Sequence, residues 1–147
     1  MERGRRIAFD FGDARIGVAV SDPDSILATP VTTLDTKSQD LWDQIFNLFS
    51  EYEPVEIFVG RPIHLAGHDS DSTVKSELFA KEIHERFGLN VSLIDERLST
   101  VTAQRKLKDA GLSTRESKNA IDQASAVAIL ELAIESAKGR ERREADE

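Results

Sequence analysis

The amino-acid sequence predicts an α/β fold: a five-stranded mixed sheet with helices on both faces. Three apolar segments separated by turn residues fill residues 7–34, which is typical of an antiparallel meander. Helical and strand-like patterns then alternate from residue 41 to residue 95, which favours parallel strands joined by crossover helices. A long apolar helical pattern closes the chain and can cover the second face of the sheet.

The first hairpin carries an acid where a buried strand is expected. Apolar residues alternate over residues 7–11, with Asp10 among them, and a second apolar run covers residues 16–20. Gly12 permits a tight turn between the two runs. A carboxylate in a buried strand is costly unless a positive group meets it, so Asp10 is a candidate functional residue.

The later elements follow from apolar spacing and from turn signals. A third strand is expected over residues 26–34, where Pro30 indicates an edge or a bulge. Apolar residues at helical spacing predict helices over residues 41–52 and 74–87, with short strands at 55–60 and 91–95. In the 41–52 helix, Trp42 and Phe46 widen the apolar stripe of the helix, and its aromatic residues are expected in the core.

The last third of the chain is predicted to be helical. Ser99 or Thr100 can cap a helix that closes at residues 110–111. Residues 113–116 match a capping box for a final helix through residue 134. We expect one domain over residues 1–137 and a charged, disordered tail over residues 138–147.

Composition excludes several classes of protein. Of the 147 residues, 39% are hydrophobic and 31% charged, as in globular proteins, and the absence of cysteine excludes thiolate and disulfide chemistry. No apolar run approaches the roughly 20 residues of a membrane span, and the charged N-terminus is not followed by a signal-peptide core. We therefore expect a cytoplasmic protein.

The charge distribution leaves two interpretations open. The formal net charge of −8 argues against a nucleic-acid partner, because phosphate binding needs local positive charge. Residues 97–118, however, hold six basic and two acidic side chains, a net charge of +4. This segment is either a solvated helix face or a surface that contacts phosphates.

Acidic residues occur on three separate predicted elements. Asp10 lies on the first strand, Asp95 and Glu96 end the last strand, and Asp122 begins the final helix beside the small residues Ser125 and Ala126. Clustered carboxylates repel one another and favour a hard cation such as Mg²⁺ or Mn²⁺, as in two-metal phosphoryl transfer. The alternative is that each acid pairs with an arginine or caps a backbone group.

Other chemical motifs are weak. His64 and His68 are four residues apart in a polar loop, and two histidines alone make an incomplete zinc site. The sequence has no Walker-type glycine loop and no Gly-x-Ser-x-Gly motif.

Four motifs stand out along the chain: DFGDARIGVAVSD at 10–22, VGRP at 59–62 with Gly67, DERLST at 95–100 and DQASA at 122–126. Together they resemble the YqgF (RuvX) family of bacterial RNase H-like proteins. The similarity covers roughly residues 5–135, and the most specific motif is the third. The family is described as resembling Holliday-junction resolvases and as maturing the 5′ end of pre-16S ribosomal RNA.

The resemblance implies an RNase H-like fold with Asp10, Glu96 and Asp122 as catalytic residues and ligands of Mg²⁺ or Mn²⁺. The choice of Glu96 over Asp95 comes from the family. Basic residues expected to hold the phosphate backbone are Arg15 and Arg97, which match basic family positions, and Arg105, Lys106 and Lys108 in the basic segment.

The sequence also departs from the family pattern at four positions. Asp13 and Ala14 stand where Thr or Ser and then Lys are common, and Arg61 and His64 replace a leucine and an asparagine. These changes affect the expected contacts with substrate more than they affect the acidic residues.

Three functions remain to be distinguished. The first is a metal-dependent nuclease that cuts pre-16S rRNA at its 5′ end, free or within the ribosome precursor. A nuclease acting on branched DNA, such as a Holliday junction, is a variant of the same chemistry. The third is a ribosome-assembly factor that binds RNA without cutting it, which the acidic net charge and Asp13 favour. An actin-like ATP-binding module would need two domains, and 147 residues supply one.

Overall fold

The computed structural model describes residues 1–62, 71–98 and 115–146. Three strands form the predicted antiparallel meander, and two more extend it on the other side of β1 in parallel. The order β3-β2-β1-β4-β5 makes β1 the central strand, as predicted. The strands are β1 (Arg6–Phe11), β2 (Arg15–Ser21), β3 (Ala28–Asp35), β4 (Glu56–Arg61) and β5 (Asn90–Asp95).

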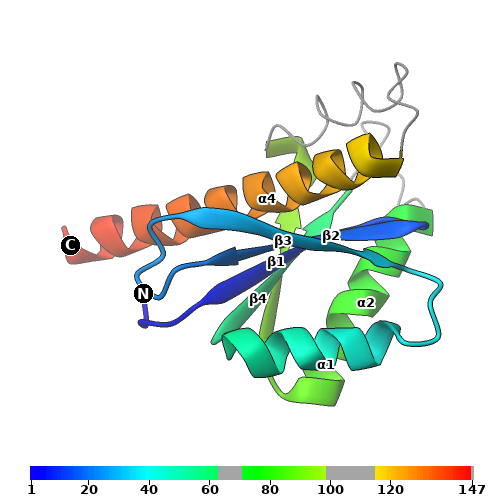
Figure 1. Ribbon diagram of the computed structural model, residues 1–147. Coiled ribbons are helices and arrows are strands. Elements are labelled where there is room, and N and C mark those ends of the chain that lie inside the picture. Colours follow the sequence, from blue (N-terminus) through cyan, green and yellow to red (C-terminus); the bar gives the residue numbers. More distant parts are fainter. Residues whose placement is uncertain (63–70, 99–114, 147) are drawn as a thin grey trace.

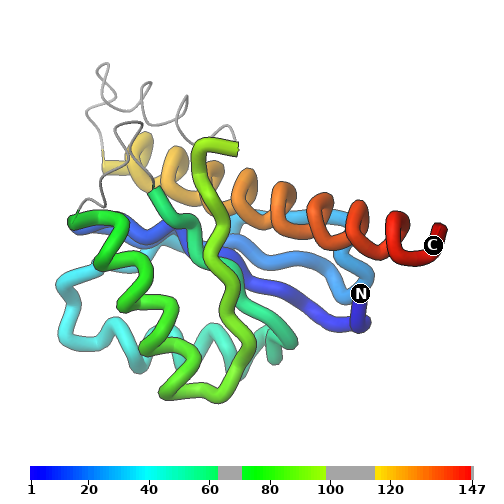
Figure 2. Tube along the Cα trace, turned by 180° about the vertical axis from the view of Figure 1, so that it is seen from behind, coloured from blue at the N-terminus to red at the C-terminus, as the bar shows by residue number. Residues whose placement is uncertain are grey.

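Helices cover both faces of this sheet. Helices α1 (Leu41–Tyr52) and α2 (Asp71–Phe87) pack on one face, and α4 (Arg115–Ala145) crosses the other (Figures 1 and 2). A single 3₁₀ turn, Glu96–Leu98, directly follows β5. None of the described helices has a segment that is both long and apolar enough to cross a bilayer.

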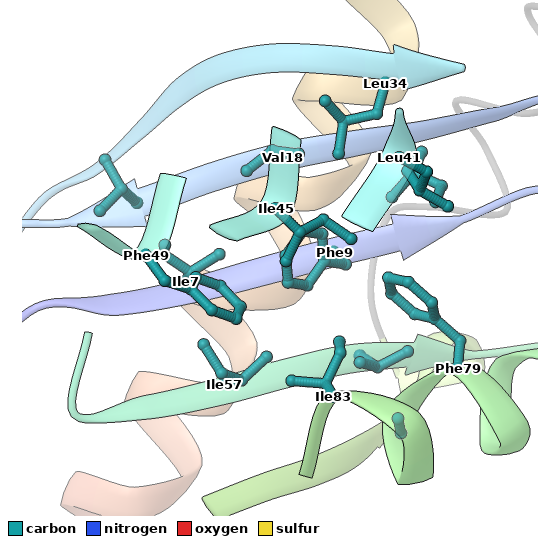
Figure 3. Packing of buried hydrophobic residues seen from close by; sticks show 14 residues of the cluster. Ile7, Phe9, Val18, Leu34, Leu41, Ile45, Phe49, Ile57, Phe79 and Ile83 are labelled. Carbon is teal, nitrogen blue, oxygen red and sulfur yellow. The ribbon is translucent and has the colours of Figure 1, made fainter. Parts of the chain in front are cut away.

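The face under α1 and α2 holds the larger core (Figure 3). Side chains alternate along a strand, so Ile7 and Phe9 of β1 point to this face. Phe9 meets Phe79 of α2 edge to face, with ring centroids 5.4 Å apart. This face therefore holds more of the buried apolar side chains than the face under α4 does.

The face under α4 is built from smaller side chains. Ala8 and Ala19 on the two central strands pack against an α4 stripe that recurs every three or four residues. Small strand residues allow a helix to lie close to the sheet. The buried apolar residues of the stripe are Ala126, Ile129, Leu130, Ala133 and Ile134.

Several local expectations need adjustment. β3 begins at Ala28 instead of residue 26. The edge or bulge that Pro30 indicated is confirmed, because β3 is an edge strand and its pairing with β2 shifts between Val18 and Ala19, next to Pro30. Phe46 was expected in the apolar stripe of α1 but is 58% exposed. On α2 the buried face uses Thr73 and Ser76, small polar residues that fit close to the sheet.

The predicted disordered tail from residue 138 is helical as far as Ala145, where α4 ends. Lys138 Nζ donates a hydrogen bond to the carbonyl oxygen of Ser25, 2.7 Å away. The amino group of Met1 pairs with Glu141, and the N-terminus lies beside this part of α4 (Figure 1). These contacts give the charged helix partners that the sequence pattern alone did not reveal.

Candidate active site

Asp10 lies on the face of the sheet that α4 covers. It follows Ala8 by two residues on β1, and Ala8 packs against α4. Asp10 pairs with Gly17 of β2 on one side. On the other side, Phe9 pairs with Val59, so the next position of this register sets Asp10 beside Gly60 of β4. Asp10 is 4% exposed and is therefore a buried acid between two glycines.

Asp122 lies above the first of these glycines. A Cβ atom built on Gly17 would be 2.0 Å from the carbonyl oxygen of Asp122, so the α4 backbone rests directly on β2. Asp122 precedes Ala126 by one helical turn and continues the buried stripe of α4 toward its N-terminal end. It is 6% exposed.

Glu96 lies above the second glycine. A Cβ atom on Gly60 would be 2.7 Å from Oε1 of Glu96 and 2.4 Å from Cδ1 of Ile129. Glu96 is 3% exposed, so of the two neighbouring acids it is the one buried under α4. Asp95 instead binds Arg97, whose Nη2 lies 2.8 Å from its Oδ2. The structure therefore brings Asp10, Glu96 and Asp122 to adjacent positions on one face.

Asp10 and Asp122 line one cavity of about 240 Å³ between the β1–β2 turn and the start of α2. We refer to it as the acidic cavity. Arg15 enters the same cavity, and its Nε lies 2.7 Å from Oδ2 of Asp122. The ion pair is partly buried, since the Asp122 side chain is 8% exposed and that of Arg15 is 26% exposed. Arg15 thus supplies the positive partner that a buried carboxylate requires.

The two substitutions near the site that depart from the family pattern both have partners on α2. Asp13 lines the acidic cavity and accepts a bond from Lys75 Nζ at 3.2 Å, so its added negative charge is balanced. Arg61 pairs with Glu77, with Nε and Oε1 2.7 Å apart.

The predicted phosphate-binding residues are distributed unevenly. Arg15 lies in the acidic cavity, as described above. Arg97 is outside it, 47% exposed at the side chain and bound to Asp95, which holds the pKa of Arg97 above its usual range. Arg105, Lys106 and Lys108 lie outside the described residues, as do His64, His68 and the predicted helix after residue 99.

The chemistry of the donor set fits a hard divalent ion, because Asp10, Glu96 and Asp122 offer oxygen ligands only. The Arg15 guanidinium against Asp122 also shows that this acid accepts a cationic neighbour. Within residues 1–62, 71–98 and 115–146, however, no three acidic or histidine side chains are grouped closely enough to hold a metal ion as they stand. Metal binding would therefore require these side chains to rearrange.

Sequence reasoning found the three acids but not the glycines that position them. Gly17 and Gly60 sit at equivalent places beside Asp10, and each leaves room for a group that approaches from α4 or β5. The sequence does contain a sign of this arrangement, because each of the two strands that flank β1 has a glycine beside Asp10. Such a glycine indicates close approach of another backbone or side chain.

The fold is that of the RNase H-like nucleases. Thermus thermophilus RuvC in complex with a Holliday junction substrate superposes with a TM-score of 0.58 over 92% of this chain and 96% of RuvC, at 14% identity. A second Thermus thermophilus RuvC structure gives a TM-score of 0.54 at 12% identity, with the same coverage. At such low identity the comparison defines the fold alone.

The chain belongs to the RuvX family. The family model, described as "Holliday junction resolvase", matches residues 4–136. A protein of Streptomyces avermitilis named "Putative pre-16S rRNA nuclease" is 45% identical over 138 residues, covering 92% of this chain and 88% of its own length. A protein of the same name from Mycobacteroides abscessus is 46% identical over 132 residues, covering 88% of this chain and 80% of its own. These comparisons support a nuclease activity.

Proposed function

We propose that this protein is a metal-dependent nuclease that processes the 5′ end of pre-16S rRNA. The observation that carries the proposal is that Asp10, Glu96 and Asp122, three buried acids from separate elements, lie around Gly17 and Gly60 on the face of the sheet under α4. The names of its relatives supply the substrate, and a cytoplasmic location would follow from that substrate.

In this proposal Asp10, Glu96 and Asp122 are the catalytic residues and would hold Mg²⁺ or Mn²⁺. Divalent ions bound by carboxylates activate a water molecule and stabilise the charge that develops on a phosphodiester under attack. The backbone of Asp10 is held by the pairing of the central strand β1 with its neighbours, and the glycines beside it leave room for its side chain to move. Asp122 is held in position by the contact of its backbone with Gly17 and by its ion pair with Arg15.

Of the two predicted substrate-binding residues that the structure describes, Arg15 has the better position. It lines the acidic cavity and presents five N–H donors in a planar fork suited to a phosphate group. Arg97 can reach a phosphate only by exchanging its contacts with Asp95. Roles for Arg105, Lys106 and Lys108 remain proposals from the sequence.

The test is a cleavage assay on a pre-16S rRNA fragment with Mn²⁺. Asp10→Asn, Glu96→Gln and Asp122→Asn should each lower the rate by at least about 100-fold, since catalytic residues that act as a unit show such losses singly. Two acids close to the site provide matched controls. Asp95→Asn and Asp13→Asn remove the same charge and should retain most of the activity, because Asp95 binds Arg97 and Asp13 binds Lys75.

A thermal melt gives a readout that does not depend on cleavage. Mn²⁺ should raise the melting temperature of the wild type and raise it less in Asp122→Asn, because binding to the native state stabilises it by mass action. Equal increments in the two proteins would show that Asp122 is not a ligand.

Branched DNA is the second candidate substrate, favoured by the description of the family model. A synthetic four-way junction assayed beside the rRNA fragment decides between them. If the protein binds RNA but cuts neither substrate, the third function, a non-catalytic assembly factor, is correct.

A further inference from the structure

A second cavity, of about 450 Å³, adjoins the acidic one. It lies between the β1–β2 turn, the end of β3 and the first turns of α4. The residues around it are Ala14, Arg15, Thr33, Leu34, Asp35, Arg115, Lys118 and Asn119. We refer to it as the basic cleft.

The basic cleft has the opposite charge to its neighbour. Arg15, Arg115 and Lys118 oppose the single acid Asp35, giving the lining a net charge of +2 in a chain of net charge −8. Lys75 and Arg97, two other cations near the site, pair with carboxylates. Among the residues that the structure describes, no ion pair is recorded for Arg115 or Lys118. A concentration of positive charge with few local acids favours an anionic ligand.

The two cavities adjoin at the β1–β2 turn. Ala14 and Arg15 line both, and the Nε of Arg15 binds Asp122 on the acidic side. A chain that carries phosphates at regular intervals can therefore place one phosphate by the acids and a neighbouring phosphate in the basic cleft. A free phosphate or a single nucleotide would fill only one of these positions.

The cations of the cleft are mounted on secondary structure whose relative position is fixed. Thr33 of β3 donates a hydrogen bond to the carbonyl oxygen of Asn119, 3.1 Å away. Its Oγ1 also accepts a bond from Nε2 of Gln123 at 3.1 Å. These bonds join β3 to α4 one residue after Lys118, and sites on joined helices and strands are better defined than sites on loops.

The lining also indicates which part of a nucleic acid it contacts. None of its eight residues is aromatic, so the cleft offers no ring on which a base could stack. Arginine and lysine side chains that contact phosphate position a chain without reading its sequence. The cleft is therefore suited to the backbone of a nucleic acid.

We infer that the basic cleft binds a phosphate of the substrate strand next to the phosphate that is cut, through Arg115, Lys118 and Arg15. The inference rests on the proposed function for the identity of the ligand, a polynucleotide. It adds a requirement, because a substrate must extend beyond the cut on the side of β3 and α4.

The experiment measures binding of a fluorescent single-stranded RNA oligonucleotide by anisotropy, in chelator, over a series of salt concentrations. The variant is Arg115→Ala with Lys118→Ala, and circular dichroism checks its fold. The slope of log affinity against log salt should become shallower by about 0.7, since one phosphate contact on a single strand contributes about 0.7. Arg140→Ala with Arg143→Ala removes the same charge from the exposed far end of α4 and should leave the slope unchanged.

A chemical modification identifies the phosphate that is bound. Oligonucleotides carrying one neutral methylphosphonate linkage, placed at successive positions, should bind the wild type more weakly at one position next to the cut. The same oligonucleotide should lose much less with the double variant, because two of the three partner side chains are already absent. Inorganic phosphate in excess should compete only weakly with RNA if the ligand is a polynucleotide.

The outcomes separate this inference from the proposed function. An unchanged salt slope in the Arg115–Lys118 variant, or equal losses in the Arg140–Arg143 variant, overturns the basic cleft as a phosphate site. Effective competition by inorganic phosphate would also overturn it as a polynucleotide site. A wild type that never cuts RNA refutes the nuclease while the binding result stands, because binding is measured without metal.

Discussion

The carbonyl oxygen of Asp122 lies where a side chain at Gly17 would begin, since a Cβ at Gly17 would be 2.0 Å from that oxygen. Real Cβ atoms do not come so close to other atoms, so only glycine permits this approach of α4 to β2. Gly17 is also the register partner of Asp10. One glycine thus sets the spacing between two candidate catalytic acids.

Gly17→Ala should destabilise the protein and lower its nuclease activity. The new methyl group meets backbone atoms of α4, which cannot rotate away, so the helix itself must shift. Overpacking of this kind costs about 1–3 kcal/mol. Urea unfolding measures the loss of stability, and the cleavage assay measures the effect on Asp122.

The control is Gly139→Ala on the same helix. The nearest atom to the new Cβ would be Arg143 Nη1 at 3.7 Å, so this change should stabilise the protein by up to about 1 kcal/mol. Equal effects of the two changes would contradict this account.

Gly60→Ala should affect activity more than stability. Its Cβ would meet the ends of two side chains, Oε1 of Glu96 and Cδ1 of Ile129, which can rotate aside. We expect a free energy of unfolding within about 1.5 kcal/mol of wild type, since side chains relax more readily than backbone. Displacing Glu96 should lower cleavage by about as much as Glu96→Gln does. Full activity in Gly60→Ala would mean that the position of Glu96 is unimportant, and the proposed role of this acid would be wrong.

The sheet could be predicted from the sequence because its signals are local. Alternation in the hairpin and the order of strands and helices were sufficient to place β1 at the centre with Asp10 on it. Glu96 is buried, whereas its neighbour Asp95 pairs with the exposed Arg97. The pattern of residues alone did not show which of these two acids is buried. Neighbours on a strand point to opposite faces, but the face that carries the site depends on where α4 packs.

The remaining differences have a common physical cause, namely long-range contacts. The charged residues from 138 onward predict disorder when considered alone, yet Lys138 and Glu141 bind groups more than 100 residues away. Of the apolar residues in the predicted helix over residues 74–87, Phe79 and Ile83 are buried, but Val74 and Leu78 are 44% and 59% exposed. The helix also buries Thr73 and Ser76, whose small side chains fit close to the sheet. Apolar spacing does not show which of two overlapping stripes packs better.

Arg15→Gln should lower stability in chelator and increase the stabilisation by metal. The change leaves the Asp122 carboxylate buried without its cationic partner, which costs about 1–3 kcal/mol for a hydrogen bond to a charged group. A divalent ion then no longer competes with a guanidinium for Asp122. In thermal melts, Mn²⁺ should raise the melting temperature of Arg15→Gln by more than it raises that of the wild type.

The control is Arg3→Gln, which breaks an exposed ion pair with Asp24 and should leave the increment in melting temperature unchanged. A smaller increment in Arg15→Gln would indicate that the arginine helps to bind the ion instead of excluding it.

The lowered pKa of Asp95 should make the free energy of unfolding depend on pH, and the Asp95→Asn variant isolates this contribution from that of the catalytic acids. Hydrogen bonds from the Arg97 guanidinium lower the pKa of this carboxyl below its usual range, although partial burial acts in the opposite direction. The backbone N–H of Arg97 and the nearby charge of Arg61 lower the pKa further. Because the folded pKa is lower, the unfolded state binds more protons in acid. The stability that Asp95 contributes is therefore complete above its unfolded pKa of about 3.9 and is lost as the pH falls through the folded value.

The prediction compares wild type with Asp95→Asn by urea unfolding between pH 3 and pH 7. The wild type should be more stable by a constant amount from about pH 7 to pH 5, and the difference should shrink below about pH 4. Its size should be under about 1 kcal/mol, because the Arg97 side chain is 47% exposed and solvent screens the pair. Added salt should reduce it further. A difference that grows toward low pH would require a raised pKa, and the Arg97 pairing would then not represent the state of the protein in solution.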